Sequence, residues 1–91
     1  MRRASKVDGN QPSIIKALRK IGASVEFIGQ PLDLLVSFRG RTFLMECKDR
    51  NGKGQLTKGQ IKFIERWPGE LHVVFDVNEA LHATIGPKAM Q

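Results

Sequence analysis

Two acidic residues and a lysine are spaced so that a β-hairpin would bring their side chains together. Residues 33–38 and 41–48 are both rich in apolar residues and are separated by only two positions, which predicts two strands joined by a tight turn. Counting back from that turn places Asp33 directly opposite Glu46. Opposed residues project from the same face of a sheet, about 4.5–5.5 Å apart at Cβ. Side chains alternate along a strand, so Lys48 joins them on that face.

Such a pair of carboxylates needs compensation, because like charges opposed across two strands repel. A divalent cation is one solution, since Mg²⁺ is commonly held by one or two carboxylates and keeps several waters for phosphate groups. The alternative interpretation is that Asp33 ends a loop and that Glu46 and Lys48 form an ordinary solvated ion pair. The apolar residues on either side favour the metal site, because charges at the end of a buried hairpin require a partner.

The composition is that of a small globular protein. The chain has 91 residues, of which 41% are hydrophobic and 26% charged, so we expect one domain comprising residues 1–91. No apolar run approaches the roughly 20 residues of a membrane span, and residues 1–6 lack a secretory apolar segment, so we expect a cytoplasmic protein. A single cysteine excludes a disulfide framework and a cysteine zinc cluster. We expect residues 1–7 to form a flexible basic arm and residues 87–91 a frayed tail.

The charge distribution favours a polyanionic partner. The net charge is +6, and residues 39–66 contain eight Lys and Arg against three acids. A basic surface around an acidic pocket suits nucleic acid whose backbone is brought to a metal ion. The candidates for contact with the DNA backbone are Arg39, Arg41, Arg50, Lys53, Lys58 and Lys62.

A first helix is predicted near Asn10 and Gln11, with Pro12 in the first turn and Gly22 as the stop. One of Asn10 and Gln11 is expected to cap the helix, and the alternative is that they make polar contacts at the edge of the site. Its buried stripe is predicted to be Ile14, Ile15, Leu18 and Ile21. Residues 23–28 follow as a strand, and the hairpin comes next.

A second helix is predicted to open at Thr57, which has Gln60 at capping-box spacing, and to end at Pro68. Its apolar side chains, all assigned to the core, are Ile61, Ile64 and Trp67, with Phe63 beside them. Residues 71–77 predict an interior strand, and Asn78 is expected to cap a last helix over residues 79–85. The predicted order of elements is αβββαβα.

In order and content the chain resembles the PD-(D/E)XK nuclease superfamily and, more closely, its virus-type replication-repair (VRR) nuclease family. The segments that carry the resemblance are Pro31-Leu32-Asp33-Leu34-Leu35-Val36, Glu46-Cys47-Lys48 and Leu56-Thr57-x-x-Gln60. Two further segments are similar to small phage-encoded members, namely Asp8-Gly9-Asn10-Gln11 and Ala17-Leu18-Arg19-x-x-Gly22. The resemblance extends from about residue 8 to about residue 81. It implies an α/β, restriction-endonuclease-like αβββαβ core, with a central mixed sheet flanked by helices and a short C-terminal helix.

The resemblance also implies a site and an activity. Asp33, Glu46 and the Cys47 carbonyl would bind Mg²⁺ or Mn²⁺, and Lys48 would orient or deprotonate the attacking water. Gln60 would contact the scissile phosphate or Lys48, or it would only complete the capping box with Thr57, and both roles are compatible. The implied protein is a phage- or prophage-encoded endonuclease that cuts branched DNA such as Holliday junctions. Two symmetric cuts by a chain with one site would require a homodimer.

Two positions depart from the family pattern. Leu32 separates Pro31 from Asp33, and Ser13 stands where many members have a metal-binding glutamate in the first helix. The site would then hold a single ion, or Asp8 would contribute from the preceding loop. Two other functions stay open: a catalytically inactive nucleic-acid-binding module, and an interaction protein whose hairpin charges are simple ion pairs. RNA also stays open as a substrate. Three side chains are assigned no chemistry: Cys47 as a core residue, and His72 and His82 as unrelated histidines.

Overall fold

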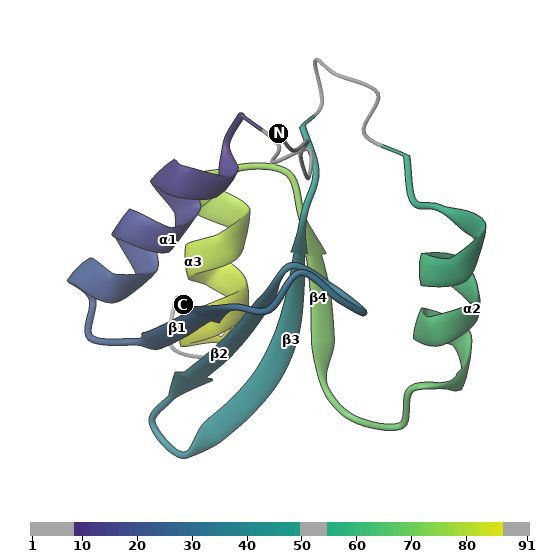
Figure 1. The fold of residues 1–91 in the computed structure, drawn as a ribbon. Coiled ribbons are helices and arrows are strands. Elements are labelled where there is room, and N and C mark those ends of the chain that lie inside the picture. Colours follow the sequence, from purple (N-terminus) through teal and green to yellow (C-terminus); the bar gives the residue numbers. More distant parts are fainter. Residues whose placement is uncertain (1–8, 50–54, 87–91) are drawn as a thin grey trace.

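A computed structural model describes residues 9–49 and 55–86 of the chain. These residues form a small α/β fold with a four-stranded mixed sheet and three helices (Figure 1). The elements are α1 (Gln11–Lys20), β1 (Ser24–Phe27), β2 (Leu34–Phe38), β3 (Arg41–Cys47), α2 (Lys58–Arg66), β4 (Leu71–Val74) and α3 (Val77–Ile85). The predicted order and the α/β class are confirmed. The predicted arm and tail lie outside the described residues, as do Asp8, Arg50 and Lys53.

The sheet has the strand order β1-β2-β3-β4, and its central hairpin has the predicted register. β2 runs antiparallel to β1 and β3, whereas β4 is parallel to β3. Phe38 pairs with Arg41 across a two-residue turn whose residues, Arg39 and Gly40, have φ values of 50° and 82°. Positive φ at both central positions is characteristic of the tight hairpin turns whose twist matches that of the strands. This turn therefore fixes which residues of the two strands face each other.

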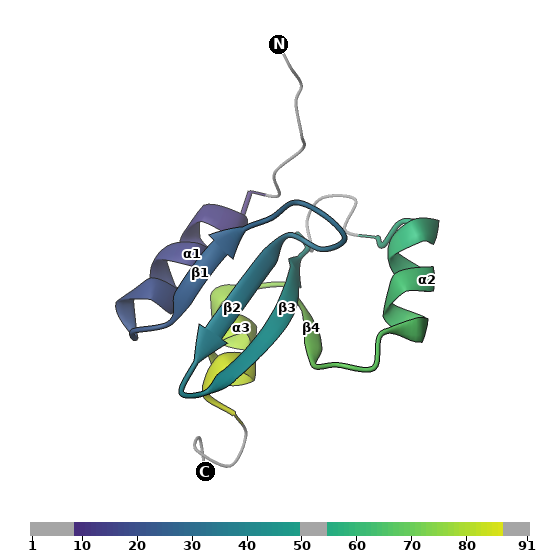
Figure 2. The same ribbon diagram turned by 60° about the horizontal axis from the view of Figure 1, so that its bottom comes forward.

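The helices cover the two faces of the sheet unequally. α1 and α3 lie side by side against one face, and α2 lies on the other side of the strands (Figure 1, Figure 2). The larger core forms beneath α1 and α3 and includes Ile14, Leu18, Val36, Phe43, Met45 and Cys47. The smaller core lies beneath α2 and contains Leu32, Leu44 and Phe63, with Ile64 and Leu71 packed against it. Alternation along β3 explains the division, because Leu44 points away from its neighbours Phe43 and Met45.

Strand β4 is shorter and more exposed than its sequence predicts. Among the described strands, it lies at the edge of the sheet and pairs only with β3, so the predicted interior position is wrong. The strand stops at Val74, because Asp76 caps α3 through a hydrogen bond from the Glu79 amide to Asp76 Oδ1 (2.8 Å). The last helix thus begins at Val77 and is not capped by Asn78.

Helix α2 has the predicted capping box, but its buried side differs from the predicted one. The Thr57 hydroxyl accepts from the Gln60 amide (3.1 Å), and the Gln60 side chain accepts from the Thr57 amide (3.0 Å). Phe63 is the residue of α2 that is buried, whereas Ile61 is 42% exposed and Trp67, just past the helix, is 40% exposed. Trp67 stacks on Phe63 with ring centroids 5.1 Å apart. The assignment of Trp67 to the core is therefore wrong, because α2 contacts the sheet along one narrow side.

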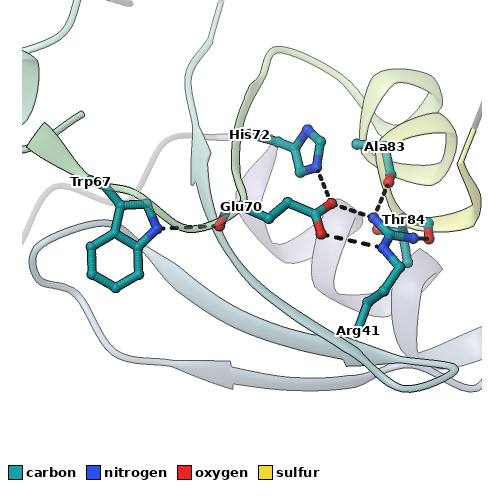
Figure 3. A network of polar contacts seen from close by, with 6 residues as sticks. All are labelled: Arg41, Trp67, Glu70, His72, Ala83 and Thr84. Carbon is teal, nitrogen blue, oxygen red and sulfur yellow. Dashed lines mark hydrogen bonds and ion pairs between the residues drawn. The ribbon is translucent and has the colours of Figure 1, made fainter. Parts of the chain in front are cut away.

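A cluster of charged groups joins the hairpin, β4 and the end of α3 (Figure 3). The Arg41 guanidinium binds the Glu70 carboxylate and donates to the carbonyls of Ala83 (3.0 Å) and Thr84 (2.6 Å). His72 Nε2 lies 2.7 Å from Glu70 Oε2. A cation at the carboxyl end of a helix is favourable, because the terminal carbonyls there carry partial negative charge. The hydrogen bond from Arg41 lowers the pKa of Glu70, and the same contact raises the pKa of Arg41.

No helix among residues 9–49 and 55–86 has the length and apolar character needed to cross a membrane.

Replacing Glu70 with Gln should lower the free energy of unfolding at pH 7 by up to about 1 kcal/mol, because the pair with Arg41 is partly exposed to solvent. A carboxyl whose pKa is lowered by folding stabilises the fold above its unfolded pKa, and this contribution disappears as the pH falls through the folded pKa. Urea unfolding of both proteins from pH 7 downward should therefore show the difference shrinking. A difference independent of pH would contradict this, and Glu65→Gln on the exposed side of α2 serves as the control.

Candidate active site

Asp33 and Glu46 meet at the open end of the hairpin, one position beyond the Leu34–Met45 pair. The Asp33 amide donates to Glu46 Oε1 (3.0 Å), and the Cys47 amide donates to Asp33 Oδ2 (2.9 Å). Each carboxylate is thus held by the main chain of the opposite segment. β2 itself begins at Leu34 rather than at the predicted Asp33, because the Asp33 carbonyl turns toward the β1–β2 loop and accepts from the amide of Ile28 (2.8 Å).

Glu46 is the buried member of this pair. It is 2% exposed, and its Oε2 accepts from Gln60 Nε2 (2.8 Å) and lies 3.3 Å from Lys48 Nζ. Burial raises the pKa of Glu46, and the nearby charge of Asp33 raises it further, while Gln60 and Lys48 lower it only in part. One ammonium and several hydrogen bonds therefore do not fully compensate the two acids.

Gln60 completes the predicted capping box and also contacts Glu46, whereas the contact that the resemblance implied was to the scissile phosphate or to Lys48. Its Oε1 accepts from the Thr57 amide, so its Nε2 is the donor to Glu46 and the orientation of the amide group is determined. The capping box holds the Gln60 side chain at the start of α2, and Gln60 Nε2 reaches the Glu46 carboxylate. Gln60 thus joins α2 to the hairpin through one polar contact.

Asn10 uses its side chain for long-range contacts to the main chain rather than for capping. It stands at the start of α1, but its side chain makes no capping hydrogen bond, and Gln11 is the first residue of the helix and is buried. Asn10 thus occupies the predicted N-cap position but does not cap α1 through its side chain. Asn10 Nδ2 instead donates to the carbonyls of Lys48 (2.9 Å) and Phe75 (2.8 Å), tying together the ends of β3 and β4. Its Oδ1 is buried and has no hydrogen-bond partner among the described residues.

The ligand set suits a hard cation better than zinc. Across residues 9–49 and 55–86 there is no cluster of three or more His, Cys, Asp and Glu side chains placed to hold a metal. Cys47 is fully buried in the larger core, on the face opposite Glu46, which leaves only its carbonyl as a ligand. Two carboxylates and one carbonyl resemble the sparse, water-completed sets that hold Mg²⁺. The raised pKa of Glu46 beside Asp33 fits this interpretation, because a divalent cation would relieve their repulsion.

The predicted DNA-contacting residues differ in their surroundings. Arg39 is exposed at the tip of the hairpin, with its guanidinium 4.9 Å from the centroid of the Phe38 ring, and Lys58 and Lys62 are exposed on α2. Arg41 is engaged by Glu70 and by the end of α3, so it has the fewest donors left for a phosphate. Ser13, at the position of the absent helix acid, is exposed on α1.

Comparison of the chain with protein-family models, with curated proteins and with solved structures finds no match. The functional assignment accordingly depends on the geometry of the chain's own residues and on the resemblance carried by its motifs.

Replacing Asn10 with Ala should lower the free energy of unfolding by about 1–2 kcal/mol, because two carbonyls lose their donor. Removal of the unpartnered Oδ1 offsets part of this loss. Urea unfolding of Asn10→Ala and of Ser13→Ala, an exposed change on the same helix, provides the comparison. Equal stability of the two variants would show that the Asn10 contacts contribute nothing.

Proposed function

We propose that this chain is a metal-dependent endonuclease that hydrolyses phosphodiester bonds in DNA. The observation that supports this most strongly is the joint placement of two carboxylates and an ammonium at one hairpin mouth. Asp33 and Glu46 exchange hydrogen bonds with each other's strands, and Lys48 Nζ lies 3.3 Å from the same Glu46 oxygen that Gln60 holds. A structural ion pair would require only one of these acids.

The residues divide the chemistry between them. Asp33, Glu46 and the Cys47 carbonyl would hold Mg²⁺ or Mn²⁺, which would supply Lewis acidity toward a water and a phosphate oxygen. Lys48 places its ammonium beside these ligands, where it orients the attacking water and offsets charge that develops on the phosphate. Gln60 donates to the Glu46 carboxylate and so restricts its rotation.

The fold supports assignment to the restriction-endonuclease-like group and to the VRR nuclease family. The features expected of that group are the element order αβββαβα, the mixed sheet, and two acids at the open end of the β2–β3 hairpin. The position of Gln60 at the start of the helix that follows also agrees with it.

The substrate proposed is branched DNA, including Holliday junctions. Exposed Arg39, Lys58 and Lys62 would contact phosphates without reading sequence. Each chain offers one pair of acids at the hairpin, so a two-fold homodimer would present two sites to the two strands of a junction.

A second candidate function is a nucleic-acid-binding module that does not cut. It is favoured by the first helix, since α1 carries Gln11 and exposed Ser13 rather than an acid near the site. This module would bind DNA in a strongly salt-dependent way and would release no product with any divalent ion.

Cleavage of junction, flap and linear duplex DNA with Mg²⁺ or Mn²⁺ separates these functions. Wild-type protein should cut at least one branched substrate, and Glu46→Gln and Lys48→Met should each cut at least about 100-fold more slowly, because the first loses a charged metal ligand and the second loses the ammonium beside the phosphate. Glu65→Gln, on the exposed side of α2, should cut like wild type. Salt-sensitive binding without cleavage would establish the binding module, and equal cutting by Glu46→Gln would remove this site from the mechanism.

A further inference from the structure

A pocket of about 410 Å³ lies between the loop after β1 and helix α2. Its volume is in the lower part of the roughly 300–1,000 Å³ range typical of small-molecule sites. The residues that matter here are Gln30 and Pro31 on the loop and Gly59, Gln60, Phe63 and Arg66 on the helix. The pocket thus has walls from two separate elements.

The pocket and the candidate active site share the residue Gln60. This residue lines the pocket and also donates from Nε2 to Glu46 Oε2 at 2.8 Å. The loop wall at Pro31 precedes Asp33 by two residues. A group that enters the pocket would therefore adjoin whatever is bound between Asp33 and Glu46.

The walls combine flat, apolar and amide groups. Pro31 provides apolar surface, and exposed Arg66 has its guanidinium 5.3 Å from the centroid of the Phe63 ring, on which Trp67 also stacks. Gln30 is exposed and offers both a donor and an acceptor. A nucleobase can be bound by such a combination, because its face stacks on a guanidinium plane and its edge pairs with an amide.

Gly59 leaves this part of the pocket wall without a side chain. It is the second residue of α2 and lies in the first turn of the helix. An added Cβ at Gly59 would meet only Thr57 Oγ1, at 3.9 Å, so packing within the described part of the chain does not require glycine. A glycine facing a pocket leaves the backbone open to close approach by a bound group.

We propose that this pocket receives one unpaired nucleobase of the nucleotide next to the bond that is cut. The inference rests on the proposed nuclease function and narrows its substrates to DNA with an unpaired nucleotide at the cleavage point, such as a flap or a bulge. In continuous duplex the base would first have to leave its stack, which disfavours cleavage there.

The test compares two flap substrates of the same sequence. One has an unpaired nucleotide with its base next to the bond that is cut, and the other has an abasic nucleotide at that position. Wild type should cleave the substrate with the base at least tenfold faster in kcat/KM. Gly59→Leu, which fills the pocket, should cleave both at the slower rate, and Gly59→Ala should keep most of the preference. Both variants should unfold at or above the wild-type temperature, because the backbone at Gly59 accepts a side chain without strain.

Equal cleavage of the two substrates by wild type would overturn the base pocket and leave the nuclease function intact. Wild type could also cleave the two substrates equally while Gly59→Leu cleaves both more slowly. The pocket would then receive the DNA backbone rather than a base, which also overturns the proposal. If wild type cut neither substrate, the nuclease function would fail separately. The base pocket would then be tested by measuring the binding of the same two oligonucleotides in Ca²⁺. At least tenfold tighter binding of the oligonucleotide that carries the base, with this difference lost in Gly59→Leu, would support the pocket, and equal binding would overturn it.

Discussion

The buried carboxylate of Glu46, facing Asp33, is the constraint on which the rest of this structure depends. A carboxylate that is 2% exposed loses most of its hydration, and a second acid nearby adds repulsion. The protein surrounds Glu46 with donors from the Asp33 amide, Gln60 and Lys48, yet the pKa of Glu46 stays above its usual range. We propose that the remaining repulsion between the two acids favours the binding of a divalent cation between them.

The other elements hold this arrangement in place from several directions. The turn at Arg39 and Gly40 sets the register that opposes the two acids, and the capping box of α2 aims Gln60 at Glu46. Asn10 fixes the ends of β3 and β4 behind the site. At the far end of β3, Arg41 joins the hairpin to the end of α3 (Figure 3). A site held by polar contacts from separate elements keeps its geometry before a substrate arrives.

The features that the sequence predicts well are those set by local chemistry. The hairpin register follows from a two-residue turn between apolar strands, and the Thr57–Gln60 box follows from spacing within one helical turn. The contacts that escape prediction join distant residues. Asn10 reaches carbonyls 38 and 65 positions away, and Arg41 reaches Glu70, 29 positions away. The edge position of β4 is missed as well, because an apolar run does not show how many neighbours a strand has.

The most direct test is a pH titration of the Glu46 carboxyl carbon by NMR, with and without Mg²⁺. Without the cation, we expect the midpoint to lie above the usual range of a glutamate, because of burial and of Asp33. With saturating Mg²⁺, the midpoint should move well below it, because the ion binds the ionised form. A midpoint that is the same in both conditions would show that no cation is held between Asp33 and Glu46.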